Sequence, residues 1–296
     1  MADGDGDTDW QIEGWTVNSS LLEVLRCPEG CAVPLELSIR EGEKDQIQAG
    51  LLCCPTCSRT YPVENGIARM LPSALTDADH ALSDDSTVRK RSEMRARDEQ
   101  ALDYDRMWHL NLFGLLEIPM TLRQLALAPD HLLLEAGCGT GRMTRQFAAR
   151  CRQVVAVDFS WDSLHSCAAK LQKAGVRNVD LIQADICRLP LQSAIFDRIV
   201  SCQVLEHIPT PAAREQAIEE LGRVMRPGGN LVLSAYQYSW ITRLFTQKEG
   251  EHTGGIYFYR FARDELQALL SRSLTVEAIS GALIYHYTAR CRKGEV

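Results

Sequence analysis

The stretch LLLEAGCGTG, residues 132–141, decides the fold of this 296-residue chain. Residues 132–135 form an apolar run that predicts a strand buried on both faces. The glycines that follow predict a sharp turn, and a helix through residue 147 comes next. Glycine lets a backbone approach a ligand closely, and the N-terminus of the helix offers free N–H groups. The spacing is G-x-G-x-G, whereas dinucleotide-binding loops have G-x-G-x-x-G.

Strands and helices alternate on the C-terminal side of this loop. Helices are expected over residues 161–174 and 264–270, and after Thr210 and Pro211, with Ser160 and Thr210 as N-caps. Strands alternating with such helices predict an α/β fold built on a doubly wound, largely parallel sheet. The expected strands after the first are residues 154–157, 179–183, 198–201, 231–235, 275–280 and 283–289.

Three carboxylates end successive strands of this pattern. Glu135 ends the first strand, where it would repel a pyrophosphate but accommodate an ammonium group. Asp158 ends the second strand and could accept hydrogen bonds from both hydroxyls of a ribose. Asp185 ends the third strand and could accept from an adenine amino group. Either aspartate alone could merely cap a helix or turn, but the series of three predicts a nucleoside-like ligand with a cationic tail.

The central part of the chain resembles the class I S-adenosylmethionine-dependent methyltransferases, in the group with the small-molecule and quinone-type enzymes. The motifs LLLEAGCGTGRMT, VVAVDFS, QADICRLP, FDRIVSCQVLEHIP and LGRVMRPGGNLVLSAY carry the resemblance and stand in the family's order. It implies a Rossmann-like, seven-stranded methyltransferase sheet. It also implies that the helix with Tyr104 and Trp108 folds over the cofactor. The implied cofactor-binding residues are Glu135, Gly137, Cys138, Gly139, Gly141, Asp158, Phe159, Asp185, Ile186 and Gln203.

Paired cysteines mark a separate unit near the N-terminus. Cys27 and Cys31 form one knuckle, and Cys54 and Cys57 form the other, which suits a tetrahedral structural zinc site. Cys53 could replace Cys54, and a metal-free miniature domain with buried thiols is the alternative. The order LLEVLRCP…LLCCPTCSRTYPVENGIARML is similar to the Trm112-like zinc modules, which occur alone or fused ahead of methyltransferase domains. That resemblance implies a small zinc-ribbon-like domain whose zinc takes no part in methyl transfer.

Three side chains are candidates for a base that deprotonates the methyl acceptor. His207 follows the fourth strand and titrates near neutral pH; Tyr236 and His252 compete with it for the role. A histidine that merely shapes its loop is the alternative for His207. Residues 236–261 are rich in aromatic side chains and could wall the acceptor pocket or simply cover the sheet edge.

The domain organisation follows from composition. We expect a disordered acidic tail over residues 1–19, a zinc module over 20–72, a linker over 73–98 and a methyltransferase domain over 99–296. Within that domain we expect a helical lid at 99–126, a cofactor core at 131–236 and the acceptor-side segment at 236–261. The linker carries a basic run: Arg89, Lys90, Arg91, Arg95 and Arg97.

The bulk composition excludes several classes of protein. No apolar stretch is long enough to span a bilayer, so no membrane partner is expected. The N-terminus lacks a signal-peptide pattern, which favours the cytoplasm. The net charge of -7 does not favour nucleic acid as a partner.

Three functions compete. The first is methylation of a small-molecule oxygen or nitrogen atom by direct in-line transfer, which the acidic charge and the aromatic segment favour. The second is methylation of an RNA base, as in the zinc-ribbon rRNA guanine methyltransferases, which the basic run and the zinc module favour. The third is a non-catalytic cofactor-binding scaffold that recruits a partner. The sequence leaves the acceptor and the oligomeric state open.

Overall fold

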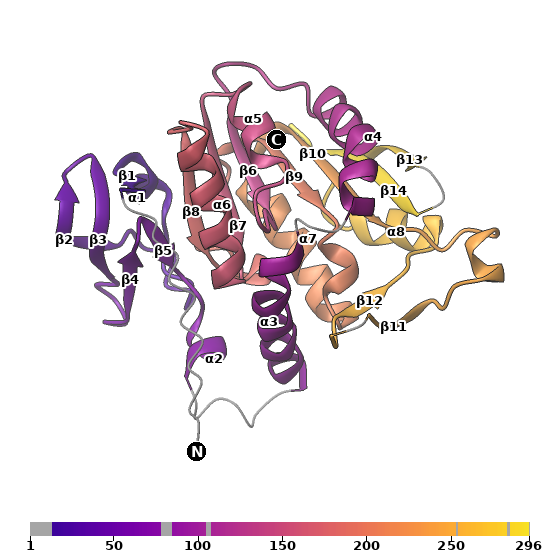
Figure 1. Ribbon diagram of the computed structural model, residues 1–296, viewed down its shortest axis with the longest axis horizontal. Helices are drawn as coiled ribbons and strands as arrows, with labels where there is room; N and C mark the ends of the chain where they lie inside the picture. Colours follow the sequence, from indigo (N-terminus) through magenta and orange to yellow (C-terminus); the bar gives the residue numbers. More distant parts are fainter. Residues whose placement is uncertain (1–13, 78–84, 105–107, 253, 283–284, 296) are drawn as a thin grey trace.

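A computed structural model describes residues 14–77, 85–104, 108–252, 254–282 and 285–295. Its centre is the sheet that the sequence predicts, with strands in the order β8-β7-β6-β9-β10-β14-β13 (Figure 1). The first five are parallel, whereas β14 pairs antiparallel with both β10 and β13. The bounds are β6 (Leu132–Ala136), β7 (Gln153–Asp158), β8 (Val179–Gln183), β9 (Phe196–Cys202), β10 (Met225–Tyr236), β13 (Thr275–Ala282) and β14 (His286–Arg292).

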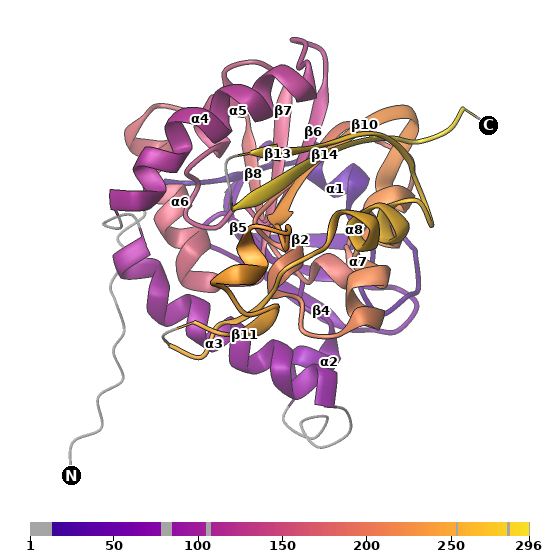
Figure 2. The same cartoon turned by 90° about the vertical axis from the view of Figure 1, so that its right-hand side faces the viewer.

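Helices cover both faces of this sheet, which confirms the doubly wound prediction (Figure 2). Both predicted N-caps are present, since Ser160 Oγ accepts from Ser163 N and Thr210 Oγ1 accepts from Ala213 N. One face carries α4 (Trp108–Leu125), α5 (Thr144–Ala148) and α6 (Trp161–Lys173), and the other carries α7 (Pro211–Val224) and α8 (Arg263–Leu270).

The N-terminal module continues the same sheet. Its last strand, β5 (Ile67–Arg69), pairs in parallel with β8, so one sheet of 12 strands runs through both parts of the chain. Polar contacts reinforce the junction: buried Asp180 accepts from Asn18 N at 2.8 Å, and the Arg69 guanidinium lies 4.5 Å from the Trp161 ring centroid. The module otherwise contains β1 (Val17–Asn18), α1 (Ser20–Val24), β2 (Glu36–Glu43), β3 (Gln46–Cys53) and β4 (Thr60–Glu64).

Two sequence-based expectations about irregular segments are wrong. Residues 17–18 of the expected acidic tail form β1 against β3, and Trp15 is buried; residues 1–13 lie outside the described part. The expected linker contains α2 (Ser73–Thr76) and most of α3 (Asp85–Tyr104). The sequence of α3 shows no helical repeat of apolar residues, because this helix is anchored to the rest of the protein by polar contacts. Asp98 Oδ1, for example, accepts from Ser160 Oγ at 2.6 Å.

Candidate active site

The glycine loop after β6 is held by backbone bonds and has room for a ligand. Gly137 N and Cys138 N both donate to Val157 O. Gly137, Gly139 and Gly141 all have positive φ. A Cβ on Gly137 would lie 2.1 Å from Val204, and one on Gly141 would lie 2.5 Å from Cys167, so both glycines allow close packing. A Cβ on Gly139 would meet nothing within 4 Å, so the loop faces open space there.

Asp158 joins the end of β7 to this loop. Its Oδ2 accepts from Gly139 N at 2.7 Å, and its Oδ1 accepts from Ser160 N at 3.0 Å. Burial raises the pKa of this carboxyl, although the hydrogen bonds from Ser160 and Gly139 oppose the rise. A carboxylate has about four lone-pair sites, so Asp158 keeps capacity for two hydroxyl donors.

Glu135 is a buried carboxyl with unused hydrogen-bonding capacity. Only 6% of the residue is exposed, and its Oε2 has no hydrogen-bond partner among the described residues. Burial raises its pKa to about 8. An ammonium group beside it would supply both a donor and a compensating charge.

Asp185, at the end of β8, is already engaged in a contact that the sequence did not predict. Its Oδ1 accepts from Cys187 N at 2.9 Å, and its Oδ2 accepts from Lys90 Nζ at 2.6 Å. Burial opposes the charge on Lys90, but the attraction of Asp185 outweighs it and raises the pKa of Lys90. This residue of the basic run therefore points into the protein.

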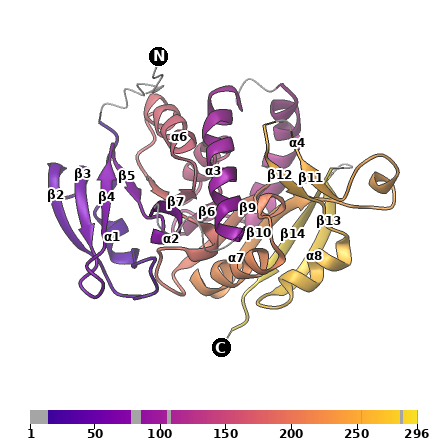
Figure 3. The ribbon, with the colours of Figure 1, turned by 90° about the horizontal axis from the view of Figure 1, so that it is seen from below.

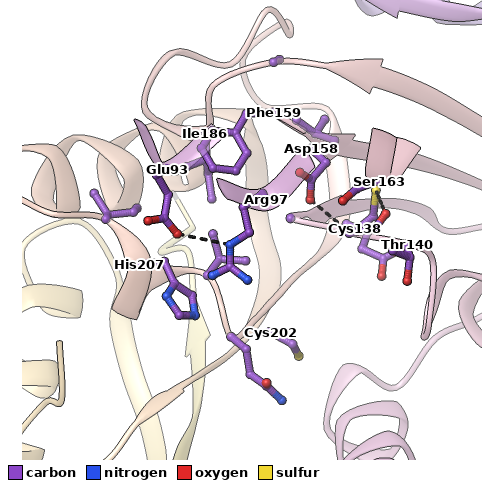
Figure 4. A pocket seen from close by; sticks show the side chains of 18 of the residues that line it. Glu93, Arg97, Cys138, Thr140, Asp158, Phe159, Ser163, Ile186, Cys202 and His207 are labelled. Atoms are coloured by element: carbon purple, nitrogen blue, oxygen red, sulfur yellow. Dashed lines mark hydrogen bonds and ion pairs between the residues drawn. The ribbon is translucent and has the colours of Figure 1, made fainter. Parts of the chain in front are cut away.

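One cavity brings these groups together (Figure 4). All the predicted cofactor-binding residues line it except Gly141, which lies behind the loop against α6. Helix α3 contributes Lys90, Glu93 and Arg97 to the wall. Figure 4 shows Arg97 between His207 and Asp158, with its Nε donating to Glu93 Oε1 at 3.2 Å. These three residues were missed because they belong to a segment expected to be a linker.

The donors and acceptors in this cavity fit S-adenosylmethionine. Glu135 and the open backbone at Gly139 suit the methionine part, and Asp158 suits the ribose diol. Phe159 and Ile186 supply apolar surface for a purine between Asp158 and Asp185. The side chains of Tyr104 and Trp108, the expected covering residues, lie outside the described part.

The three candidate bases lie in one cluster, but only His207 lines the cavity. The His207 ring lies 5.7 Å from the Tyr236 ring and 6.2 Å from the His252 ring, between centroids. Its Nδ1 donates to Tyr257 O at 2.6 Å, because a carbonyl can only accept. The neutral ring therefore keeps its lone pair on Nε2. Burial, followed by the positive charge of Arg97, lowers the pKa of His207 well below its ordinary value.

Two further acids lie beside this cluster, of which one is partly and the other fully buried. Glu117 of α4 accepts from Gln203 Nε2 at 2.9 Å and from Arg142 at 2.8 Å, and so holds Gln203 beside the glycine loop. Glu206 is fully buried, neither carboxyl oxygen has a partner among the described residues, and burial raises its pKa to about 8. The sequence gives no signal for Glu117, since the contact spans 86 positions.

The aromatic segment 236–261 divides into groups with different surroundings. Phe258 stacks on His252 at 4.6 Å between ring centroids, next to the candidate bases. Tyr259 instead packs under the Arg214 guanidinium and against Phe261, which is buried in the core. Trp240 and Phe245 are exposed to solvent. Only part of the segment is therefore placed to contact an acceptor.

The four predicted cysteine ligands form a cluster in the N-terminal module. The sulfur atoms of Cys27, Cys31, Cys54 and Cys57 all lie within 4.8 Å of one another. The Cys27–Cys57 sulfur distance is 3.7 Å. Tetrahedral zinc with Zn–S bonds of about 2.3 Å places its sulfur ligands about 3.8 Å apart. Cys53 turns toward the carbonyl of Cys54 and is not in the cluster, so the four residues fit a closed structural zinc site.

Comparison with known proteins agrees with both parts of this picture. Residues 134–233 match the model of a methyltransferase domain, and residues 18–66 match that of the Trm112p-like proteins. Residues 134–233 thus form a methyltransferase domain of the S-adenosylmethionine-dependent kind, and residues 18–66 form a Trm112-like module ahead of it. Among solved structures, the methyltransferase resembles the Burkholderia thailandensis 1,6-didemethyltoxoflavin-N1-methyltransferase with bound S-adenosylhomocysteine. The TM-score is 0.59 at 16% identity, with 88% of this chain and 100% of the other covered.

Its other relatives are diverse. An uncharacterized chloroplastic methyltransferase of Arabidopsis thaliana is 26% identical, covering 78% of this chain and 66% of the relative. A protein of Bos taurus named as tRNA methyltransferase 9B is 29% identical, covering 41% of this chain but only 25% of that protein. The complex of the Haloferax volcanii Trm112 methyltransferase activator with a methyltransferase shares the fold, with a TM-score of 0.57 at 13% identity, covering 67% of this chain and 98% of the other. The chain thus spans from a quarter to just under two thirds of these two curated relatives.

Two further observations bear on which kind of acceptor the chain could bind. Most of the basic run is used internally: Lys90 pairs with Asp185, Arg91 donates to Ala74 O and Asp77 O, and Arg97 pairs with Glu93. Within the described residues, no helix is long and apolar enough to cross a membrane.

Proposed function

We propose that this chain transfers the methyl group of S-adenosylmethionine to an oxygen or nitrogen atom of a small molecule. The observation that carries the proposal is the position of His207. Its ring lines the same cavity as the glycine loop and Asp158, and its Nδ1 is committed to the Tyr257 carbonyl. The Nε2 lone pair remains for a proton of the acceptor.

When bound, S-adenosylmethionine supplies an electrophilic methyl group on a positively charged sulfur. The acceptor atom forms a bond to the methyl carbon as the carbon–sulfur bond breaks, and the bonding electrons neutralise the sulfur. The acceptor proton passes to His207 Nε2 and then to solvent. Glu135, Asp158 and Asp185 hold the donor, so catalysis depends mainly on aligning acceptor and methyl group.

The test is incubation of the purified chain with methyl-labelled S-adenosylmethionine and either a metabolite extract or total RNA. The proposal expects label in small molecules. It also expects that His207→Asn, which can still donate to the Tyr257 carbonyl, abolishes most of this transfer while S-adenosylhomocysteine binding is unchanged. Label in RNA alone would contradict the small-molecule assignment, and no label in either fraction would favour the non-catalytic scaffold.

Methylation of RNA is the second candidate, because a relative is named for tRNA methylation and because the chain contains a Trm112-like module. Against it, Lys90, Arg91 and Arg97 are paired within the protein. Arg89 and Arg95 are exposed, and Arg95 suits a test by charge reversal. Under the RNA alternative, activity falls steeply with added salt and with Arg95→Glu, because phosphate contacts are lost. Salt-insensitive methylation of a neutral metabolite would exclude it.

The cytoplasm remains the proposed location. The zinc site is proposed to be structural, since four sulfur ligands leave no open position for a substrate. The zinc module is connected to the cavity through the pairing of β5 with β8, because Asp185 lies two residues beyond the end of β8.

A further inference from the structure

A projecting loop joins β10 to β11 (Glu249–Glu251) at the end of the molecule opposite the zinc module (Figures 1 and 3). We name residues 239–248 the finger. Its tip carries three large apolar side chains in solvent: Trp240 is 76% exposed, Leu244 is 76% exposed and Phe245 is 65% exposed. Few large hydrophobic residues of the described chain are this exposed, and three of them lie within six positions. Such a concentration marks an interaction surface.

The finger is an ordered turn that directs these side chains outward. Ser239 N donates to Thr242 Oγ1 at 2.8 Å, and Thr246 Oγ1 donates to Thr242 O at 2.7 Å. Thr242, the first residue of the short 3-10 helix η4 (Thr242–Leu244), is buried, whereas its apolar neighbours are not. The finger therefore buries a polar residue and exposes its large apolar side chains to solvent.

The charge of the finger is opposite to that of the whole chain. Residues 239–248 contain Arg243 and Lys248 but no Asp or Glu, although the net charge of the chain is -7. Lys248 forms an ion pair with Glu265, so Arg243, whose guanidinium lies 5.1 Å from the Tyr238 ring centroid, supplies the positive charge near the tip. Trp and Phe favour the interfacial region of a bilayer, and arginine favours anionic lipid headgroups.

We propose that the finger docks this methyltransferase on the surface of an anionic lipid bilayer. Trp240, Leu244 and Phe245 enter the interfacial region, while Arg243 contacts lipid phosphate. A surface contact of this kind needs no membrane-spanning helix. A second copy of the chain fits this surface less well. A standard protein interface covers about 800 Å² on each partner, which is more area than one turn supplies. A dimer through the finger would also bring two Arg243 side chains together.

Docking would face the acceptor side of the methyltransferase toward the bilayer. The finger begins three residues after Tyr236, the last residue of β10, and the Tyr236 ring lies 6.0 Å from the His252 ring, between centroids. Tyr285, half exposed, lies at the root of the finger, where its carbonyl accepts from Gln237 N at 2.9 Å.

The test is co-sedimentation of the full chain with vesicles of phosphatidylcholine alone and with about one third phosphatidylserine. We expect binding to the anionic vesicles. We expect the double substitution Leu244→Ser and Phe245→Ser to lower the partition coefficient at least tenfold, and Arg243→Glu to lower it about tenfold on anionic vesicles only. Ile39→Ser on β2, 39% exposed at the other end of the sheet, is the matched control and should bind like the parent chain.

S-adenosylhomocysteine affinity and the thermal midpoint, measured on every variant, show that each remains folded. A parent chain that stays in the supernatant with anionic vesicles would overturn the proposal. Equal loss of binding in Ile39→Ser would also overturn it. A dimer in light scattering without lipid would also overturn the proposal if the double substitution dissociates it. The finger would then bind a second copy of the chain. Loss of methyl transfer with vesicle binding intact would contradict the reaction and not the docking.

Discussion

Replacement of Lys90 by Met tests how the cavity receives the adenine end of the cofactor. In the free protein, the Lys90 ammonium occupies Asp185 Oδ2 at 2.6 Å, and Cys187 N occupies Oδ1. An adenine amino group that binds Asp185 must therefore compete with Lys90. Methionine keeps most of the apolar length of lysine and removes the competing donor.

The magnitude follows from the burial of the pair. The side chains of Lys90 and Asp185 are only 16% and 10% exposed, so the contact is a largely buried, charge-assisted hydrogen bond. Such a bond contributes about 1.5–3 kcal/mol. If the cofactor displaces Lys90, Lys90→Met should tighten S-adenosylhomocysteine binding by about 10- to 100-fold, since each 1.4 kcal/mol is a factor of ten. The same substitution should lower the free energy of unfolding of the free protein by about 2 kcal/mol, because Asp185 loses its partner.

Calorimetric titration with S-adenosylhomocysteine, together with urea unfolding, measures both effects. Arg95→Met is the matched control, because Arg95 lies on the same helix but is exposed. It should change neither quantity. Weaker binding by Lys90→Met would refute the competition and make Lys90 a cofactor-holding residue; unchanged binding would mean that Asp185 serves both donors at once.

Three other predictions address the base, the buried acid and the metal. His207→Asn should slow methyl transfer by about 10²–10⁴-fold. In the parent chain, the transfer rate should be constant near neutral pH and fall only at acid pH, because the lowered pKa of His207 keeps its ring unprotonated at neutral pH. A rate that rises as the pH falls would contradict this role. Glu135, whose pKa is raised to about 8, is protonated at pH 7 and should ionise beside the cofactor ammonium. Cofactor binding should therefore release close to one proton. Calorimetric titrations in buffers of different ionisation enthalpy measure the number of protons released, and Glu135→Gln should abolish the release. Elemental analysis should find one zinc per chain, and the Cys54→Ser variant should lack it. That variant should also have a lower melting temperature for the whole chain, because β5 of the zinc module pairs with β8 of the methyltransferase sheet. A folded, metal-free parent chain would contradict the zinc assignment.

The predictable parts of the fold are those that local patterns determine. Buried parallel strands such as β6 and β7 are short apolar runs, and Ser160 and Thr210 mark their helices by N-cap chemistry. The spacing of the knuckle cysteines likewise predicts the metal ligands. Choosing Cys54 over Cys53 required the structure, because adjacent residues of a strand end point in different directions.

The unpredicted parts depend on contacts between distant positions. Helix α3 is rich in polar residues, and contacts such as that of Lys90 with Asp185, 95 positions apart, hold it over the cavity. The continuation of the sheet through β5 depends on pairing with β8 more than a hundred residues later. Which of the His207, Tyr236 and His252 rings reaches the cavity could not be predicted from the sequence. Periodicity and motif spacing carry none of this information.

Titration of the parent chain with S-adenosylhomocysteine, beside Asp158→Ala, tests the central claim most directly. The parent chain should bind one molecule with a dissociation constant of a few tens of µM or tighter, about -6 to -8 kcal/mol. Asp158→Ala should weaken binding about 100-fold, because two ribose hydroxyls and Gly139 N lose a charged acceptor worth about 3 kcal/mol in total. No binding by a folded parent chain, or equal affinity in Asp158→Ala, would contradict the account.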